Sequence, residues 1–127
     1  MIALANYLGQ NGGCRIAMPA HLLVRSIVPD VQHRAAFDRW YGEDHMAEAI
    51  RVFSPSRCWR SWSEIDASVH YAFYEFDTVE ALKAMTSTEA FAEMIADFTR
   101  TWDGKVTRER DFIQSVQLVE ARPAPLD

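Results

Sequence analysis

The stretch VHYAFYEF, residues 69–76, decides the fold. Its β-branched and aromatic residues alternate between two faces, which predicts a β-strand. Bulky side chains fall on both faces: Val69, Tyr71 and Phe73 on one, and Ala72, Tyr74 and Phe76 on the other. A strand that is apolar on both faces is usually covered on both sides. We therefore expect it to belong to a sheet with a layer packed against each face.

The segment before this strand predicts a partner for it. Residues 57–65 alternate in the same way, with Trp59 on one face and Arg60 and Trp62 on the other. A short connection at 66–68 separates the two strands, so we expect an antiparallel hairpin. This hairpin supplies aromatic side chains to both faces of the predicted sheet.

Upstream of the hairpin, the pattern predicts a strand at 22–28 followed by helical segments. Asp30 is a suitable N-cap for a helix that runs towards Tyr41. Gly42 is expected to end this helix. A second helical piece then follows and is expected to end before Pro55.

Downstream of the hairpin, the pattern predicts two more helical pieces and a last strand at 106–119. The spacing of helix-capping boxes occurs twice, in Asp77 with Glu80 and in Thr86 with Glu89. The complete order, β-α-β-β-α-β, predicts an α+β ferredoxin-like fold, in which helices cover one face of an antiparallel sheet. The aromatic side chains of the uncovered face predict a homodimer formed through that face.

Composition indicates one globular domain and excludes several classes of function. The 127 residues are 49% hydrophobic and 24% charged, and the net charge is −5. This balance offers no basic field for nucleic acid or an anionic membrane, and no apolar run is long enough to span a bilayer. The two cysteines, Cys14 and Cys58, have neither metal-ligand spacing nor a disulfide framework, which indicates reduced thiols in a cytoplasmic protein.

We divide the chain into an N-terminal extension at 1–19, a single domain at 20–120 and a C-terminal tail at 121–127. The extension is rich in Gly and Asn and does not have the pattern of a secretory signal. The tail contains Pro123 and Pro125, which cannot continue a sheet.

The window FDRWYGEDHM, residues 37–46, holds the best candidate for chemistry. Trp40 and Tyr41 lie on the apolar stripe of the predicted helix, where such residues pack in the core or line a pocket. His45 follows the glycine at which the helix is expected to break, so it can face a cavity. A histidine there can act as an acid or a base, because its ordinary pKa is close to neutral pH.

Several polar side chains on the strands have two interpretations each. Arg60 and Trp62 share a face, which suits either an anionic or aromatic ligand or a dimer interface. Tyr74 can donate a hydrogen bond to a substrate oxygen. His70 shares the face of Tyr74 but lies near the hairpin turn, so we expect it to be solvated or structural.

Two further patterns argue against additional sites. Arg108 and Arg110 begin the last strand, and a charge cluster at a strand end is typical of a solvated edge. No second histidine recurs at metal-ligand spacing from His45, so no metal site is expected.

Residues 20–119 resemble the dimeric α/β barrel superfamily and, within it, the EthD-like family. The resemblance is carried by the element order, the aromatic hairpin and the motif WYGEDH at 40–45, an aromatic helix end followed by a histidine. The commoner family pattern continues as His-Leu-Pro or His-His-Pro, whereas this chain has His45-Met46-Ala47. The resemblance implies a homodimer with the histidine at the cleft between helices and sheet. Relatives with this fold include cofactor-independent monooxygenases, polyketide cyclases, muconolactone isomerases, chlorite dismutase and haem-degrading enzymes, so the fold does not select a reaction.

Three hypotheses follow for the function. In the first, the protein is a cofactor-independent enzyme in which His45 is the acid or base in oxygenation, isomerisation or cyclisation of a small, apolar, oxygenated compound. Arg60 then holds a substrate anion, and the pocket is shaped by Trp40, Tyr41, Trp62, Phe73 and Tyr74. In the second, the homodimer binds a small ligand without turnover. In the third, His45 is only part of the packing.

A cavity beside His45, with a second polar group converging on it, favours the first two hypotheses over the third. No cofactor is expected, because haem ligation by His45 has no other support in the sequence.

Overall fold

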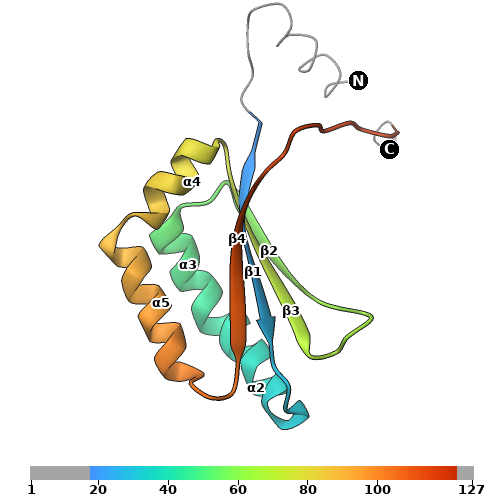
Figure 1. Ribbon diagram of the computed structural model, residues 1–127, viewed down its shortest axis with the longest axis vertical. Coiled ribbons are helices and arrows are strands. Elements are labelled where there is room, and N and C mark those ends of the chain that lie inside the picture. The colour runs from blue at the N-terminus through green and yellow to red at the C-terminus, as the bar shows by residue number, and fades with distance from the viewer. Residues whose placement is uncertain (1–17, 123–127) are drawn as a thin grey trace, which may run out of the picture.

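The computed structural model describes residues 18–122, which form one antiparallel sheet and one layer of helices (Figure 1). Most of the N-terminal extension and the end of the C-terminal tail lie outside these residues. In chain order the elements are β1 (Ala20–Ile27), α2 (Val31–Trp40), the π-helix η1 (Tyr41–His45), α3 (Met46–Phe53), β2 (Arg57–Trp62), β3 (Val69–Phe76), α4 (Val79–Thr86), α5 (Glu89–Thr101) and β4 (Thr107–Gln114). The predicted ferredoxin-like order is therefore confirmed.

The strand order in the sheet is β2-β3-β1-β4, and every neighbouring pair is antiparallel. The alternation predicted for β3 is confirmed, because Ala72, Tyr74 and Phe76 belong to the buried core while Tyr71 and Phe73 are only partly covered. β1 lies at the centre of the sheet and alternates in the same way. These two strands therefore form the floor of the core.

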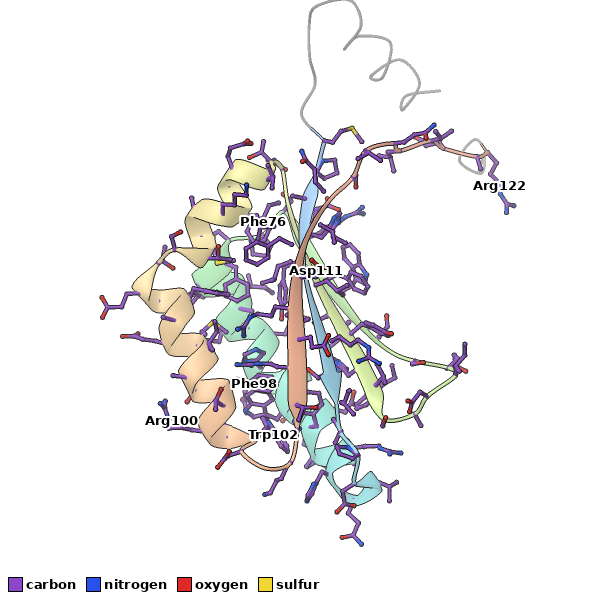
Figure 2. All side chains as sticks on the ribbon, in the orientation of Figure 1. Phe76, Phe98, Arg100, Trp102, Asp111 and Arg122 are labelled. Atoms are coloured by element: carbon purple, nitrogen blue, oxygen red, sulfur yellow. The ribbon has the colours of Figure 1, made fainter. Side chains whose placement is uncertain are left out.

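The helices cover one face of the sheet only (Figure 1). Between them and the sheet lies an aromatic core, in which Phe37 meets Phe98 and Trp102 edge-on, with ring centroids 6.0 and 5.2 Å apart. Figure 2 shows Phe76, Phe98 and Trp102 in the space between the two layers. Buried aromatic rings contribute large apolar areas and dominate the energetics of such a core. None of the helices in residues 18–122 is both long and apolar enough to cross a bilayer.

The helix does not end at Gly42, which corrects the sequence prediction. The chain passes from α2 through η1 into α3 without a break, and the N–H of Met46 donates to the carbonyl of Tyr41. The physical reason for the glycine is space, since a Cβ on Gly42 would lie 2.8 Å from Nη2 of Arg60. Gly42 therefore permits the close approach of a side chain from β2.

Three strands begin or end at different residues from those predicted. β1 already begins at Ala20, and β4 ends at Gln114 because Gln114 pairs with Ala20, the first residue of β1. β2 ends at Trp62, because the chain then turns around Ser63, whose hydroxyl accepts hydrogen bonds from two backbone N–H groups downstream.

The caps of the two later helices also differ from the prediction. α4 and α5 are capped by Thr78 and Thr88, whose hydroxyls accept a backbone N–H from the first turn. Asp77 instead accepts a hydrogen bond from the hydroxyl of Ser56, at 2.7 Å. Thr86 is the last residue of α4 and does not cap α5.

The other face of the sheet, which we call the open face, has no helix over it (Figure 1). Trp59 stacks on Phe73, with ring centroids 5.1 Å apart, and Tyr71 stacks on Phe73 in turn. His21 meets the edge of Trp59. Trp59 is 37% exposed and Ile113 is 38% exposed. The open face is therefore an aromatic surface of the kind found at protein interfaces.

Candidate functional site

A small cavity, the inner cavity, lies between the helix layer and the sheet. Its volume is about 30 Å³, which is enough for one water molecule. The apolar part of its wall is formed by Leu22, Val24, Phe53, Phe91, Met94, Ile95 and Phe98. Five side chains of its wall carry polar or charged groups: Tyr41, His45, Tyr74, Arg108 and Arg110.

The π-helix η1 brings His45 to this cavity. Turns of this kind occur frequently at functional sites. The imidazole stacks on the indole of Trp40, with ring centroids 4.6 Å apart, and meets Tyr41 edge-on at 4.7 Å. Phe98 of α5 also lies edge-on to it, at 5.4 Å. Aromatic packing on three sides therefore holds the ring in one orientation.

The surroundings keep the imidazole of His45 neutral. Burial is the main cause that lowers the pKa of His45 to about 4, and the positive charge of Arg108 lowers it further. The carboxylates of Asp97 and Glu48 act in the opposite direction. A neutral imidazole has one ring nitrogen with a free lone pair, which can accept a proton from a bound molecule.

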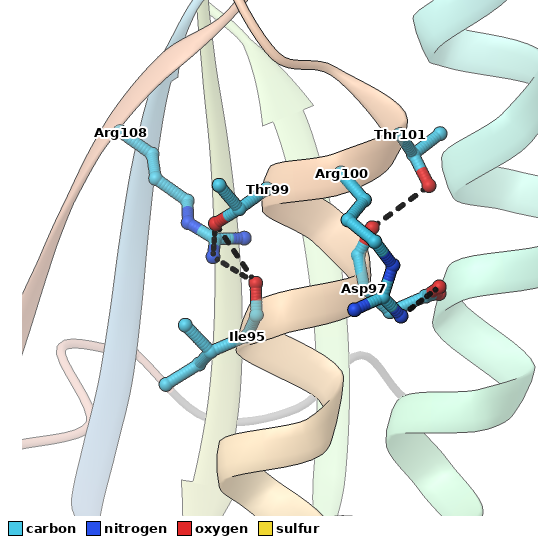
Figure 3. A network of polar contacts seen from close by, with 6 residues as sticks. All are labelled: Ile95, Asp97, Thr99, Arg100, Thr101 and Arg108. Carbon is cyan, nitrogen blue, oxygen red and sulfur yellow. Dashed lines mark hydrogen bonds and ion pairs between the residues drawn. The ribbon is translucent and has the colours of Figure 1, made fainter.

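His45 also borders a larger space on the outside of the helix layer, which we call the outer groove. The outer groove has a volume of about 710 Å³ and lies between α3 and α5. Its two arginines are paired with acidic neighbours. Arg51 pairs with Glu48, and Arg100 pairs with Asp97, as Figure 3 shows. His45 and Met94 line both the groove and the inner cavity, so they form the wall between the two.

Two buried tyrosines complete the polar part of the cavity wall. The hydroxyl groups of Tyr41 and Tyr74 lie 2.7 Å apart, and each side chain is 1% exposed. Burial raises the pKa of Tyr41 to about 12 and that of Tyr74 well above its ordinary value, so both hydroxyls are protonated at pH 7. Because one hydrogen suffices for the bond between them, the other hydroxyl hydrogen is free to donate to a molecule in the cavity.

Arg108 of β4 reaches the same cavity from the edge of the sheet. Its guanidinium donates to the carbonyl of Ile95 at 3.0 Å and to the hydroxyl of Thr99 at 3.4 Å (Figure 3). It lies over the ring of Phe98, 3.7 Å from the centroid. Burial lowers the pKa of Arg108 to about 10, so the side chain remains positively charged at pH 7.

A second polar cluster, separate from the inner cavity, surrounds Asp38. Arg60 and the indole N–H of Trp62 both donate to Oδ1 of Asp38, at 2.8 Å. These two bonds, that of Trp62 first, hold the pKa of Asp38 below its ordinary value. Arg60 also donates to Nε2 of His70, at 3.3 Å. This cluster ties α2 to β2 and β3 and contributes no group to the inner cavity.

His70 lies fully buried beside this cluster, so of its two expected positions, solvated or structural, the structural one is observed. Because Nε2 accepts from Arg60, the ring proton belongs on Nδ1. Nδ1 and the hydroxyl of Ser26, the residue opposite His70 in the sheet, are both buried and have no hydrogen-bond partner among the described residues. Burial is the main cause that lowers the pKa of His70 to about 4.

The predicted site residues thus fall in different places. Three of them line the inner cavity: Tyr41, His45 and Tyr74. Trp40 supports the ring of His45 from the outer groove. Arg60 and Trp62 are bound to Asp38, and Phe73 lies on the open face in the stack with Trp59.

Arg108 was missed because its strand was taken for a solvated edge. Arg108 occupies the register position opposite the buried Ser26, a relationship that only the assembled sheet shows. Within residues 18–122, no group of three or more His, Cys, Asp and Glu side chains is placed to hold a metal ion.

The ferredoxin-like α+β fold described above is shared by several solved structures. Solved structures with the same fold include an EthD family protein from Bacillus halodurans, 15% identical, with a TM-score of 0.58 over 74% of this chain and 97% of that one. HapK from Hahella chejuensis is 18% identical, with a TM-score of 0.59 over 84% of this chain and 99% of that one. SnoaB from Streptomyces nogalater, a cofactor-independent oxygenase, is 15% identical, with a TM-score of 0.54 over 81% of this chain and 98% of that one. No protein-family model and no curated protein matches the chain.

Proposed function

We propose that the protein is a cofactor-independent enzyme that acts on a small, apolar, oxygenated compound, with His45 as its acid or base. The observation that carries this proposal is the convergence of a neutral imidazole and a free tyrosine hydroxyl hydrogen on one apolar cavity. A histidine that served packing alone would not need a polar group facing it across a cavity. The oxygenase named among the structures of this fold supports the same class of chemistry.

The first step is proton transfer from an acidic C–H or O–H of the substrate to the free nitrogen of His45. The electron pair stays on the substrate as an enolate or phenolate. The free hydroxyl hydrogen of the Tyr41–Tyr74 pair donates to the oxygen on which this charge develops, in a buried environment where such a hydrogen bond is stronger than in water. Tyr41 and Tyr74 thus stabilise the intermediate that His45 creates.

Three outcomes share this intermediate. Return of the proton to a different carbon gives isomerisation, and attack of the carbanion on a carbonyl of the same molecule gives cyclisation. Transfer of one electron from the carbanion to dioxygen, followed by recombination of the two radicals, forms a C–O bond and a hydroperoxide. Loss of water from the hydroperoxide then leaves a carbonyl, so this oxygenation uses dioxygen without a cofactor. The cavity of about 30 Å³ holds a water-sized molecule, so a substrate enters only when side chains of the wall move. Met94, which helps to separate it from the outer groove, is a flexible side chain whose movement would enlarge it.

We further propose that two copies assemble through the open face. The stacked rings of Trp59 and Phe73, together with Ile113, form an apolar surface without a covering element among the described residues. A second sheet packed on this surface would bury it by a two-fold arrangement, in which the same patch serves both copies.

The proton-transfer step is tested with a panel of 1,3-dicarbonyl and hydroxyaromatic compounds. Exchange of the acidic C–H for deuterium is followed by NMR, and oxygen uptake is recorded in parallel. His45→Gln is expected to slow the reaction by about 10²–10⁴-fold with an unchanged circular dichroism spectrum. If the parent protein shows no turnover and His45→Gln only binds the compounds more weakly, the protein is a binding protein. An unchanged rate in the variant would leave His45 a packing residue.

A further inference from the structure

The guanidinium of Arg108 is a partly buried positive charge that has no carboxylate partner among the described residues. Its neighbours are the carbonyl of Ile95, the hydroxyl of Thr99 and the ring of Phe98. The charged group that acts on it most is another cation, Arg110. A charge withdrawn from water is normally paired, so this arrangement leaves an opposite charge to be supplied from outside.

Arg108 and Arg110 line two neighbouring spaces. One is the inner cavity, and the other, which we call the edge pocket, lies beside β4 and the end of α5 and has a volume of about 270 Å³. The edge pocket contains one acidic residue, Asp103. The outer groove differs, because its arginines are paired with Glu48 and Asp97 and it carries further carboxylates. The two approaches to the cavity therefore have opposite electrostatic character.

We infer that the substrate is a small organic anion, a carboxylate or an ionised phenol, that enters through the edge pocket and is held by Arg108 beside His45. This inference rests on the proposed function and names the class of its substrate. Arg108 takes the role that the sequence pattern assigned to Arg60, whose guanidinium is already occupied by Asp38. The hydrogen bonds to Ile95 and Thr99 use one terminal nitrogen, so the remaining N–H groups of Arg108 can bind an anion.

A bound anion would also raise the pKa of His45. The groups that act on its imidazole are Arg108 from β4, which favours the neutral ring, and Asp97 and Glu48 from α5 and α3, which favour the charged ring. An anion on Arg108 offsets the first of these, because its negative charge neutralises the guanidinium. His45 should then become a stronger base when the substrate is bound.

Salicylate and salicylamide form a matched pair of probes, because they share a ring and differ in one charge. We expect the protein to bind salicylate at least about tenfold more tightly, by titration calorimetry or tryptophan fluorescence. Arg108→Gln should remove most of this preference, since hydrogen bonds to charged groups are worth about a tenfold change or more. Arg108→Lys, which keeps the charge, should retain part of it.

Arg100→Gln is the control, because Arg100 is an exposed arginine of α5 that faces the outer groove. It should bind salicylate like the parent. Equal affinity for the two probes in the parent protein, or an equal loss for both in Arg108→Gln, would overturn the inference. His45→Gln should keep the preference for salicylate. The binding test can therefore be interpreted even if the proton-transfer proposal fails.

Discussion

The imidazole of His45 lies nearly parallel to the indole of Trp40, with ring centroids 4.6 Å apart and planes inclined by 19°. On a regular α-helix, two residues five positions apart point about 140° away from each other, because each residue advances by about 100°. The wider turn of η1 removes much of this difference. The π-helix is therefore what allows the two rings to stack and what turns His45 towards the inner cavity.

Replacing Trp40 should open the half-buried ring of His45 to water. In Trp40→Ala the imidazole gains access to water, so the pKa of His45 should rise from about 4 towards its ordinary value of 6.5. An NMR titration of the His45 ring protons measures this shift. Trp40→Phe keeps an aromatic face and should leave the pKa low. Equal pKa values in both variants would show that the stack with Trp40 does not control His45.

The stability of the protein should fall as the pH decreases from 6.5 to about 4. Burial lowers the pKa of both His45 and His70 to about 4. The unfolded chain then binds more protons than the folded protein within this window, so acid favours unfolding. A tenfold difference in proton affinity between the two states corresponds to about 1.4 kcal/mol. The fully buried His70 should therefore contribute on the order of 3 kcal/mol to the loss of stability.

Urea unfolding across this pH range measures the effect. His70→Gln should reduce the pH dependence by about half, because His45 continues to titrate. His33→Gln is the control, since His33 lies on α2 outside both polar clusters. A pH dependence that is the same in His70→Gln and the parent would contradict the assignment of His70 as a buried neutral group.

The effect of Gly42→Ala should depend on Arg60. Alanine is more stable than glycine in a helix by about 1 kcal/mol, but its Cβ would meet Nη2 of Arg60 at 2.8 Å. Displacing this guanidinium disturbs its bond to Asp38. We therefore expect Gly42→Ala to be neutral or destabilising in the parent and stabilising by about 1 kcal/mol in an Arg60→Ala background. Identical effects of Gly42→Ala in the two backgrounds, measured by urea unfolding, would show that the close approach has no energetic consequence.

The alternation of β3 and the position of Gly42 illustrate what local sequence patterns can and cannot predict. The alternation of Ala72, Tyr74 and Phe76 gave the correct face for each side chain, because burial on a strand follows a period of two. A glycine in a helical pattern predicts the end of the helix, whereas Gly42 makes room for the side chain of Arg60 from β2. That contact joins residues far apart in the sequence, so no local pattern contains it.

The candidate site was predictable in the same limited way. His45 and Tyr41 were found because they share one short window, and Tyr74 because its strand has a clear pattern. Arg108 was missed because only the packing of α5 beside β4 distinguishes a cavity-lining arginine from one on a solvated edge. Asp38, which occupies Arg60, lies on a helix whose position relative to β2 is a property of the complete fold.

Charging the open face should prevent the proposed dimer. Trp59→Lys places a charge in the centre of the aromatic stack with Phe73, where a second copy would bury it without a partner. We expect the apparent mass by light scattering to change from two copies to one, or the dissociation constant to rise at least about tenfold. Ile65→Lys is the control, because Ile65 lies beyond the end of β2 and is 99% exposed. If both variants keep the mass of the parent, the open face is not the interface.

The hydrogen bond between Tyr41 and Tyr74 provides a test that separates stability from catalysis. Either single change to phenylalanine leaves one buried hydroxyl without its partner, which should cost about 1–3 kcal/mol of unfolding free energy. The double variant Tyr41→Phe/Tyr74→Phe leaves no such group behind, so its cost should be smaller than the sum of the two.

Turnover should behave differently, because only the tyrosine whose hydrogen is free donates to the substrate. The variant that lacks this tyrosine should lose about tenfold or more in kcat, and the double variant should be no more active. Additive losses in stability, together with equal kcat in all three variants, would mean that the pair neither forms a coupled unit nor faces a substrate.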